Sequence, residues 1–90
     1  MGPPKVASVH VTVLYFAGLR DAIGRSEEAL DLPEWVRTVG ALCDHLAALH
    51  PGYADRRESV RVARNEAFAA DAEGLGDGDV IALIPPVAGG

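Results

Sequence analysis

The sequence contains one cysteine, Cys43, and one lysine, Lys5, among its 90 residues. A single cysteine excludes a disulfide within the chain and a metal cluster built on several thiolates. Thirteen acidic residues against eight basic ones give a net charge of -5, which argues against nucleic-acid binding, because that binding needs clustered Lys and Arg. No apolar run approaches the ~20 residues of a membrane span, and no secretory signal pattern opens the sequence. We therefore expect a cytoplasmic protein with neither a nucleic-acid nor a membrane partner.

Patterns that carry catalysis or hold metals are also missing. There is no Ser-His-Asp or Cys-His set, no P-loop and no paired-histidine motif. The histidines, His10, His45 and His50, are scattered, and the closest two are five residues apart, which is the wrong spacing for one helix face. The glycines of Gly74–Gly78 resemble a dinucleotide fingerprint, but they precede a strand and Asp79 replaces the third glycine. We expect no bound cofactor, no metal and no catalytic side chain in this chain.

The length predicts one domain over residues 1–90. A chain of this size buries only ~60–65% of its unfolded surface, so the core is small. Residues 1–8 begin Met-Gly-Pro-Pro and are expected to form a disordered lead-in. Cys43 lies on or beside the apolar stripe of a predicted helix, and we expect it to fill the core and not to act as a reactive thiol.

The stretch that organises the chain is its last fourteen residues. Asp77–Asp79 has the composition of a turn. Residues 80–84 form a short apolar run, typical of a strand buried on both faces. Pro85 and Pro86 end the strand, since neither has an N–H group to donate, and paired prolines favour a stiff extended conformation. The last four residues have little with which to fold and are predicted to form a flexible tail over 87–90: Val87, Ala88, Gly89 and Gly90.

Such a tail is either a frayed terminus or a device for delivering its carboxylate. Two final glycines lack Cβ atoms, so the backbone can enter a tunnel too narrow for side chains. The carboxylate of Gly90 has an ordinary pKa of about 3.5; it is ionised at neutral pH and is a poor electrophile. It needs activation, most simply as an acyl-adenylate that a partner makes from ATP.

Alternation and turn residues predict the remaining elements. Trp35 is interpreted as covering the edge of the core, with a partner surface as the alternative. Residues 27–32 are ambiguous between helix and strand, and the adjacent Pro33 favours a strand. The predicted elements are a strand over 9–16, a helical turn over 17–23 capped by Gly24, a strand over 27–32, a helix over 38–50, and strands over 59–64, 67–70 and 80–84.

One helix between two strand pairs predicts an α+β fold, in which a mixed sheet of four to five strands has the main helix packed on one face. The first and last strands are the most apolar, so they should be adjacent, central and parallel, with a right-handed crossover between them. That arrangement is the β-grasp, or ubiquitin-like, fold. The uncovered sheet face needs a partner wherever it is apolar, and the candidates there are Phe16, Phe68 and Ile84. In the helix, the stripe comprises Val39, Leu42, Cys43, Leu46 and Leu49.

Two segments carry a resemblance to a known family. They are residues 13–24, VLYFAGLRDAIG, and the closing pattern of Leu75, Asp77–Asp79, 80–84, Pro85-Pro86-Val87 and Gly89-Gly90. Over roughly residues 9–90 the chain resembles the small subunits of molybdopterin synthase, which are ubiquitin-like sulfur carriers. The Gly-Gly end is common to all such carriers. The combination of Pro-Pro-Val-x-Gly-Gly with Phe-Ala-x-x-Arg is shared by a much smaller group of proteins. Arg64 departs from the family pattern, which usually has an apolar residue there.

The resemblance implies a function for the tail, Pro85–Gly90. An activating enzyme related to ubiquitin-activating adenylyltransferases would adenylate Gly90 with ATP, and the adenylate would become a thiocarboxylate. The large subunit of molybdopterin synthase would receive the tail, in a heterotetramer, and sulfur would pass to cyclic pyranopterin monophosphate in molybdenum cofactor biosynthesis. The resemblance also places Arg20 near the large-subunit interface; the alternative for Arg20 is a solvated surface charge.

Three alternatives stay open. The carrier could serve thiamin, cysteine or tRNA thiolation, or the chain could be a ubiquitin-like modifier joined to lysines of target proteins. It could also be a plain interaction domain. The Pro85-Pro86-Val87 sequence and the chain length favour the molybdopterin synthase carrier, because many thiamin carriers are shorter.

Overall fold

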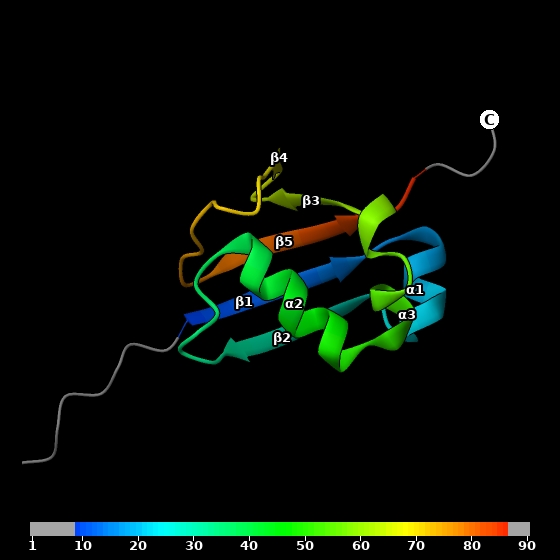
Figure 1. Cartoon of the computed structure of the whole chain (residues 1–90), viewed down its shortest axis with the longest axis horizontal. Coiled ribbons are helices and arrows are strands. Elements are labelled where there is room, and N and C mark those ends of the chain that lie inside the picture. The colour runs from blue at the N-terminus through cyan, green and yellow to red at the C-terminus, as the bar shows by residue number, and fades with distance from the viewer. Residues whose placement is uncertain (1–8, 87–90) are drawn as a thin grey trace, which may run out of the picture.

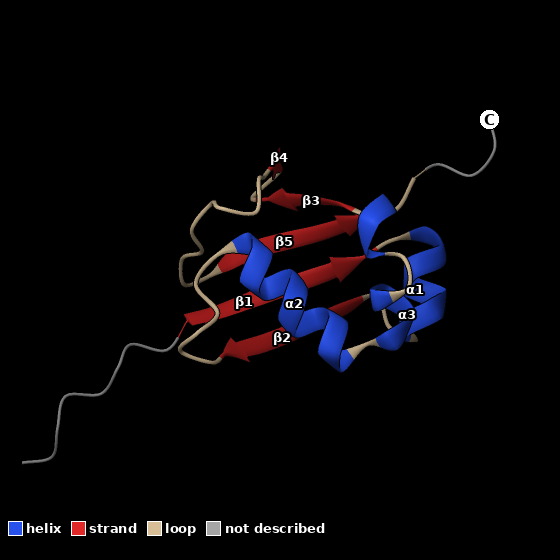
Figure 2. Ribbon diagram, viewed as in Figure 1, coloured by secondary structure: helices blue, strands red, loops and turns tan. Residues whose placement is uncertain are grey.

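In this computed structural model, residues 9–86 are described. They form one five-stranded sheet in the order β2-β1-β5-β3-β4, with helices between the strands (Figures 1 and 2). In chain order the elements are β1 (Val9–Tyr15), α1 (Ala17–Ile23), β2 (Glu27–Leu32), α2 (Val39–Leu49), α3 (Pro51–Ala54), the 3-10 helix η1 (Arg57–Ser59), β3 (Arg61–Arg64), β4 (Ala67–Phe68) and β5 (Asp79–Ile84).

The strand pairing confirms the predicted mixed sheet. β1 and β5 are adjacent and parallel, with Val13 opposite Ile81, while β2 and β3 join them antiparallel on either side. Figure 1 shows α2 crossing one face of this sheet. The fold is the expected α+β β-grasp, with one main helix packed on one face.

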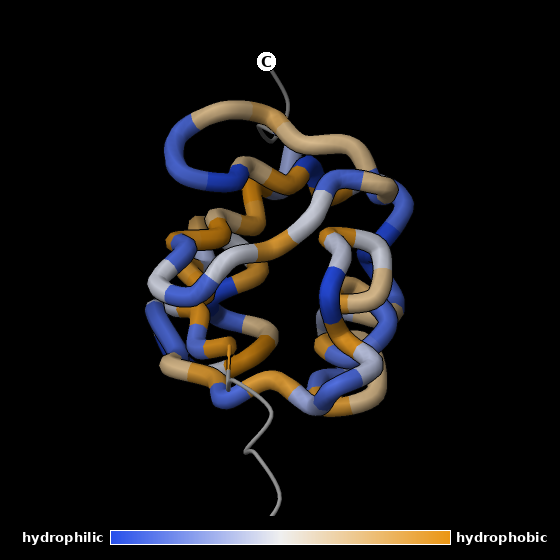
Figure 3. The backbone as a smooth tube through the Cα atoms, turned by 90° about the vertical axis from the view of Figure 1, so that its left-hand side faces the viewer, coloured by the Kyte–Doolittle hydropathy of each residue, from blue (hydrophilic) through white to orange (hydrophobic). Residues whose placement is uncertain are grey.

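The core lies between the sheet and α2. Viewed along the strands, the two layers stand side by side, and both contain hydrophobic segments (Figure 3). Val39, Leu42, Cys43 and Leu46 of α2 are buried. The predicted stripe is wrong at its last member, because Leu49 is 46% exposed. The chain turns into α3 directly after Leu49, and the buried Tyr53 of α3 joins the core at that end.

The start of α2 is fixed by a capping side chain and by a close approach to the loop before β5. Thr38 is the N-cap, and its hydroxyl accepts a hydrogen bond from the Ala41 N–H at 3.1 Å. Gly40 donates its N–H to the Asp71 carbonyl at 2.9 Å. A Cβ atom on Gly40 would lie 3.0 Å from the Cβ of Asp71. Glycine is needed at position 40 because the helix start passes so close to the loop before β5.

Three predicted boundaries differ from the structure. Pro51 ends α2 but also opens α3, because proline is well suited to the first turn of a helix. The predicted strand over 59–64 begins only at Arg61, since residues 57–59 form η1. The strand over 67–70 ends at Phe68, because only Ala67 and Phe68 pair with β3.

Trp35 is not at the edge of the core. Its side chain is 61% exposed, and its ring meets His45 edge-on with the ring centroids 5.7 Å apart. The neighbouring Val36 is fully buried instead. It belongs to a turn in which the Val36 N–H donates a hydrogen bond to the Pro33 carbonyl. The core takes the β-branched residue of this pair and leaves the indole outside.

β5 is central but is not buried on both faces. Asp79, Ile81 and Leu83 face α2 and are buried, whereas Val80 is 40% exposed on the other face. The expected burial of residues 80–84 on both faces is wrong, because no described element covers the second face of the sheet.

Candidate functional site

The central strand β5 delivers the chain to the last described residues, Ile84, Pro85 and Pro86, which we call the tail root. β5 pairs with β1 on one side and β3 on the other, so the tail root leaves from the middle of the sheet (Figure 1). The structure therefore fixes where the tail begins. The four residues that follow lie outside the described residues, and they include the Gly90 carboxylate on which the predicted chemistry depends: Val87, Ala88, Gly89 and Gly90.

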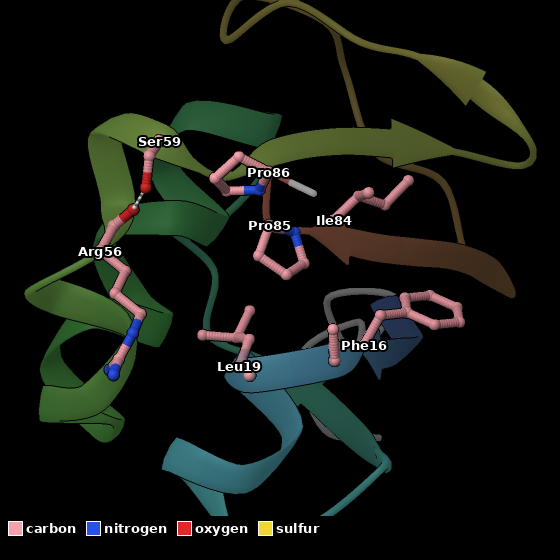
Figure 4. Close-up of a pocket in the computed structure, with 9 residues that line it drawn as sticks. Phe16, Leu19, Arg56, Ser59, Ile84, Pro85 and Pro86 are labelled. Atoms are coloured by element: carbon pink, nitrogen blue, oxygen red, sulfur yellow. Dashed lines mark hydrogen bonds between the residues drawn. The ribbon is translucent and has the colours of Figure 1, made fainter. Parts of the chain in front are cut away.

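A groove of about 640 Å³ lies beside the tail root. Figure 4 shows its walls: Phe16 and Leu19 face Pro85 and Pro86 across an open space. The Arg56 guanidinium is directed to the Gly52 carbonyl, which accepts its hydrogen bond at 3.0 Å. The full lining is Phe16, Ala17, Gly18, Leu19, Arg56, Ser59, Ile84, Pro85 and Pro86.

The sheet face away from α2, which we call the open face, brings together the predicted docking residues. Phe16 and Phe68 are 45% and 60% exposed, and Ile84 is half-buried. Because side chains alternate along β5, Ile84 lies on the same face of the sheet as the exposed Val80, four residues earlier. Large apolar side chains that stay exposed in one region are a common mark of a binding surface.

Two arginines accompany this apolar surface. Arg20, predicted near a partner interface, lies exposed on α1, which directly follows Phe16. Arg61 of β3 is exposed, and its guanidinium carbon lies 3.9 Å from the centroid of the Phe68 ring. Sequence reasoning missed this stacking, because the two residues are on different strands, β3 and β4.

A polar network that the sequence did not reveal fastens the start of β5. The Asp79 carboxylate is only 7% exposed. It accepts hydrogen bonds from Arg64 Nε at 2.6 Å, the Gly76 N–H at 2.7 Å and Asn65 Nδ2 at 2.9 Å. Burial alone would raise the pKa of Asp79, but these donors outweigh it and leave the pKa lowered. Arg64, which departs from the family pattern, thus has a partner within the fold.

The remaining titratable groups of the core side serve the fold. Burial raises the pKa of the Cys43 thiol, as expected of a core cysteine. Glu28 accepts hydrogen bonds from Tyr15 and from His50 Nε2, each at 2.8 Å, and so joins β2, β1 and the end of α2. Burial pushes the pKa of Glu28 upward, but the bonds from His50 and Tyr15 prevail and lower it. None of these side chains lines the groove beside the tail root.

Within residues 9–86, no group of three or more His, Cys, Asp or Glu side chains is arranged to hold a metal ion. No helix in that same part of the chain has the length and apolar composition needed to cross a membrane.

A β-grasp fold with an apolar open face and a central last strand defines a ubiquitin-like protein. The ThiS family model matches residues 13–90, and the chain belongs to the ThiS family. It is 34% identical to the molybdopterin synthase sulfur carrier subunit of Chlamydomonas reinhardtii, over 91% of this chain and 100% of that one. The same named subunit of Mycobacterium tuberculosis is 37% identical, over 91% of this chain and 99% of the relative.

Solved structures confirm the fold. SAMP1 from Haloferax volcanii, also described as small archaeal modifier protein 1, superimposes with a TM-score of 0.80 at 31% identity, covering 90% of this chain and 99% of that one. A protein from Pyrococcus furiosus is described as putative molybdopterin converting factor, subunit 1. It superimposes with a TM-score of 0.77 at 35% identity, covering 89% of this chain and 100% of that one. A chain of the Helicobacter pylori complex of subunits 1 and 2 of molybdopterin-converting factor superimposes with a TM-score of 0.67 at 24% identity. The superposition covers 91% of this chain and 100% of that one.

Proposed function

We propose that this chain is the sulfur carrier subunit of a molybdopterin synthase. The proposal rests on one observation. A ThiS-family fold places its tail root at the centre of the sheet, and the sequence that follows ends in Gly89-Gly90. The relatives that share a third or more of its sequence over nine-tenths of its length are named as that subunit.

The proposed chemistry takes place at Gly90. Its carboxylate attacks the α-phosphate of ATP on an activating adenylyltransferase, and pyrophosphate leaves. A sulfur donor at the oxidation level of sulfide then attacks the acyl carbon, and AMP leaves, so that a thiocarboxylate remains. Because the carboxylate is ionised and unreactive at neutral pH, ATP has to activate it before sulfur can be attached.

Sulfur release is proposed to occur on a large subunit, to which the open face docks through Phe16, Arg20, Phe68 and Ile84. The thiocarboxylate sulfur attacks a carbon of cyclic pyranopterin monophosphate and an oxygen substituent leaves that carbon, which joins the pterin to Gly90 through a thioester. Water then hydrolyses the thioester, which releases Gly90 as a carboxylate and leaves the sulfur on the pterin. A dithiolene contains two sulfur atoms, so each product consumes two loaded carriers, which suits a heterotetramer of two small and two large subunits. The H. pylori structure is described as a protein-protein complex of subunits 1 and 2 of molybdopterin-converting factor, which supports a large-subunit partner. The proposed compartment is the cytoplasm, where ATP is available.

The test is a reconstitution in two stages. The chain is first loaded with its activating enzyme, ATP and a sulfur source, and intact mass with peptide mapping should show oxygen replaced by sulfur on the C-terminal peptide. The loaded chain is then incubated with the large subunit and the pterin precursor, and molybdopterin should form. Loading without molybdopterin formation would assign the carrier to thiamin, cysteine or tRNA thiolation instead.

A second function, protein modification, is favoured by the likeness to small archaeal modifier protein 1. It predicts covalent conjugates in which the Gly90 carbonyl is joined to target lysines. Incubation with the activating enzyme, ATP and cell extract, followed by mapping of target lysines that carry the C-terminal peptide of this chain, distinguishes this function from sulfur transfer.

A further inference from the structure

The open face is electrically polarised across the sheet. One row runs from edge to edge through residues paired in register: Glu27, Leu14, Ala82, Ala63 and Phe68. Glu27 and Asp31 make the β2 edge acidic. The middle of the row is apolar, and the β3–β4 edge carries Arg61 stacked on Phe68.

Arg61 has no acidic partner among residues 9–86. Three other arginines of the chain do: Arg25 pairs with Glu28, Arg57 with Asp44, and Arg64 with Glu73 and Asp79. Stacking on an aromatic ring engages the flat face of a guanidinium and leaves the N–H donors around its edge free. A cation–π contact at an exposed site also holds the side chain in one place. Arg61 therefore presents an oriented set of donors to whatever covers the open face.

The position of Arg61 ties these donors to the tail. In the β3–β5 pairing Arg61 lies opposite Ile84, the first residue of the tail root. Side chains opposite each other in an antiparallel pair lie on the same face and in contact range. A partner that covers Ile84 in order to receive the tail must therefore also cover Arg61. Covering a guanidinium without giving it an acceptor is strongly unfavourable.

We infer that the large subunit presents an Asp or Glu carboxylate to Arg61, and that this ion pair fixes the orientation in which the carrier docks. The inference rests on the proposed function. A carboxylate matches the guanidinium with two parallel hydrogen bonds. Rotating the partner by half a turn about the sheet normal would bring that carboxylate toward Asp31, at the opposite end of the β2 edge, where like charges repel. Only one docking orientation therefore matches the charges, and it places the partner's acidic group beside the start of the tail.

The test measures the dissociation constant of the full-length carrier and its large subunit, with charge-matched variants. Arg61→Gln should weaken binding by roughly 30-fold or more, as expected when one member of a covered charge pair is removed. Arg61→Lys should fall between the wild type and Arg61→Gln, because lysine keeps the charge but not the paired donors. Arg57→Gln is the control. It removes an arginine that is paired with Asp44 of α2, the helix on the other side of the sheet from the open face, and it should leave binding unchanged.

A charge-reversal experiment separates ion pairing from a structural effect. Arg61→Glu should abolish binding at concentrations that saturate the wild type, and one Asp→Lys or Glu→Lys change in the large subunit should restore it. Circular dichroism and the urea midpoint should show that all variants fold. Equal binding of Arg61→Gln and wild type, with normal loading of both, would overturn this inference alone. If the wild-type carrier neither loads with sulfur nor binds the large subunit, the proposed function fails, and this inference fails with it.

Discussion

At the residue scale, the turn between β3 and β4 contains two residues in the left-handed region. Asn65 has φ of 49° and Glu66 has φ of 74°. Asparagine tolerates this conformation, whereas for other residues with a Cβ it costs roughly 1–2 kcal/mol. Two positive φ values in a tight hairpin are the requirement of a type I′ turn, for which Asn-Gly is strongly preferred.

Glu66→Gly should therefore stabilise the protein, by about 0.5–1 kcal/mol after the added freedom of the unfolded chain is counted. The change in the free energy of unfolding is read from urea denaturation curves. Glu66 is exposed and has no hydrogen bond among residues 9–86 that the change would remove. Glu58→Gly, in η1, serves as a control that should destabilise, since no positive φ is relieved there.

Cys43→Ser should give a folded carrier that is still loaded with sulfur. Cys43 is 4% exposed, and burial raises the pKa of its thiol. Serine places a more polar group in the core, at a cost of about 1–3 kcal/mol. Loading is measured by intact mass after incubation with the activating enzyme, ATP and a sulfur source. A folded Cys43→Ser protein that cannot be loaded would mean that sulfur passes through the thiol.

At the scale of elements, β5 is positioned by contacts between residues that are distant in the sequence and meet only in the folded chain. Alternation along residues 9–16 and the 3.6-residue repeat of α2 were sufficient to predict β1, the helix and the sheet face that packs on it. The sequence could not predict that Arg64 pairs with Asp79, because 15 residues separate them and a turn closes the distance. The position of Trp35 was predicted wrongly for a similar reason: the sequence offers two adjacent apolar residues, and only the packing of the fold buries Val36 and leaves Trp35 exposed. The same limit hid the stacking of Arg61 on Phe68.

Asp79→Asn should destabilise the protein at neutral pH and have little effect in acid. The pKa of Asp79 is lowered in the folded state, so its carboxylate stabilises the fold at pH values above the ordinary Asp pKa of about 3.9. That stabilisation disappears as the pH falls through the lower folded-state pKa. Hydrogen bonds to a charged group contribute about 1.5–3 kcal/mol, and we expect a loss of that order at pH 7.

Urea unfolding of wild type and Asp79→Asn from pH 7 to pH 2 tests this. The difference between the two free energies of unfolding should be constant above about pH 5 and shrink below about pH 4. Asp55→Asn is the matched control, because Asp55 is exposed and makes no side-chain ion pair within residues 9–86. A difference for Asp79→Asn that is equally large at pH 2 would show that its carboxylate charge is not what fastens β5.

At the scale of the whole molecule, the fold and the tail do separate work. The buried core described within residues 9–86 draws on β1, α1, β2, α2, α3 and β5, together with Val36 and Val60. The sheet fixes the direction in which the chain leaves (Figure 1), and the groove lies beside that exit (Figure 4). The proposed chemistry needs only the terminal carboxylate, which a partner must be able to reach. A change at the terminus should accordingly affect loading and spare stability.

Deletion of Gly90 is the sharpest test of that separation. The deleted protein should unfold at the same urea concentration as the wild type, because the deletion removes no residue of the core described within residues 9–86. It should not be loaded with sulfur, since its carboxylate falls one residue short, about 3.3–3.6 Å, of the position to be adenylated. Addition of Phe after Gly90 should also block loading, because a side chain then has to pass where the glycines leave room only for backbone. Unimpaired loading of the Gly90-deleted chain, or sulfur mapped to the Cys43 peptide, would contradict the assignment of the sulfur-bearing atom to the Gly90 carbonyl carbon.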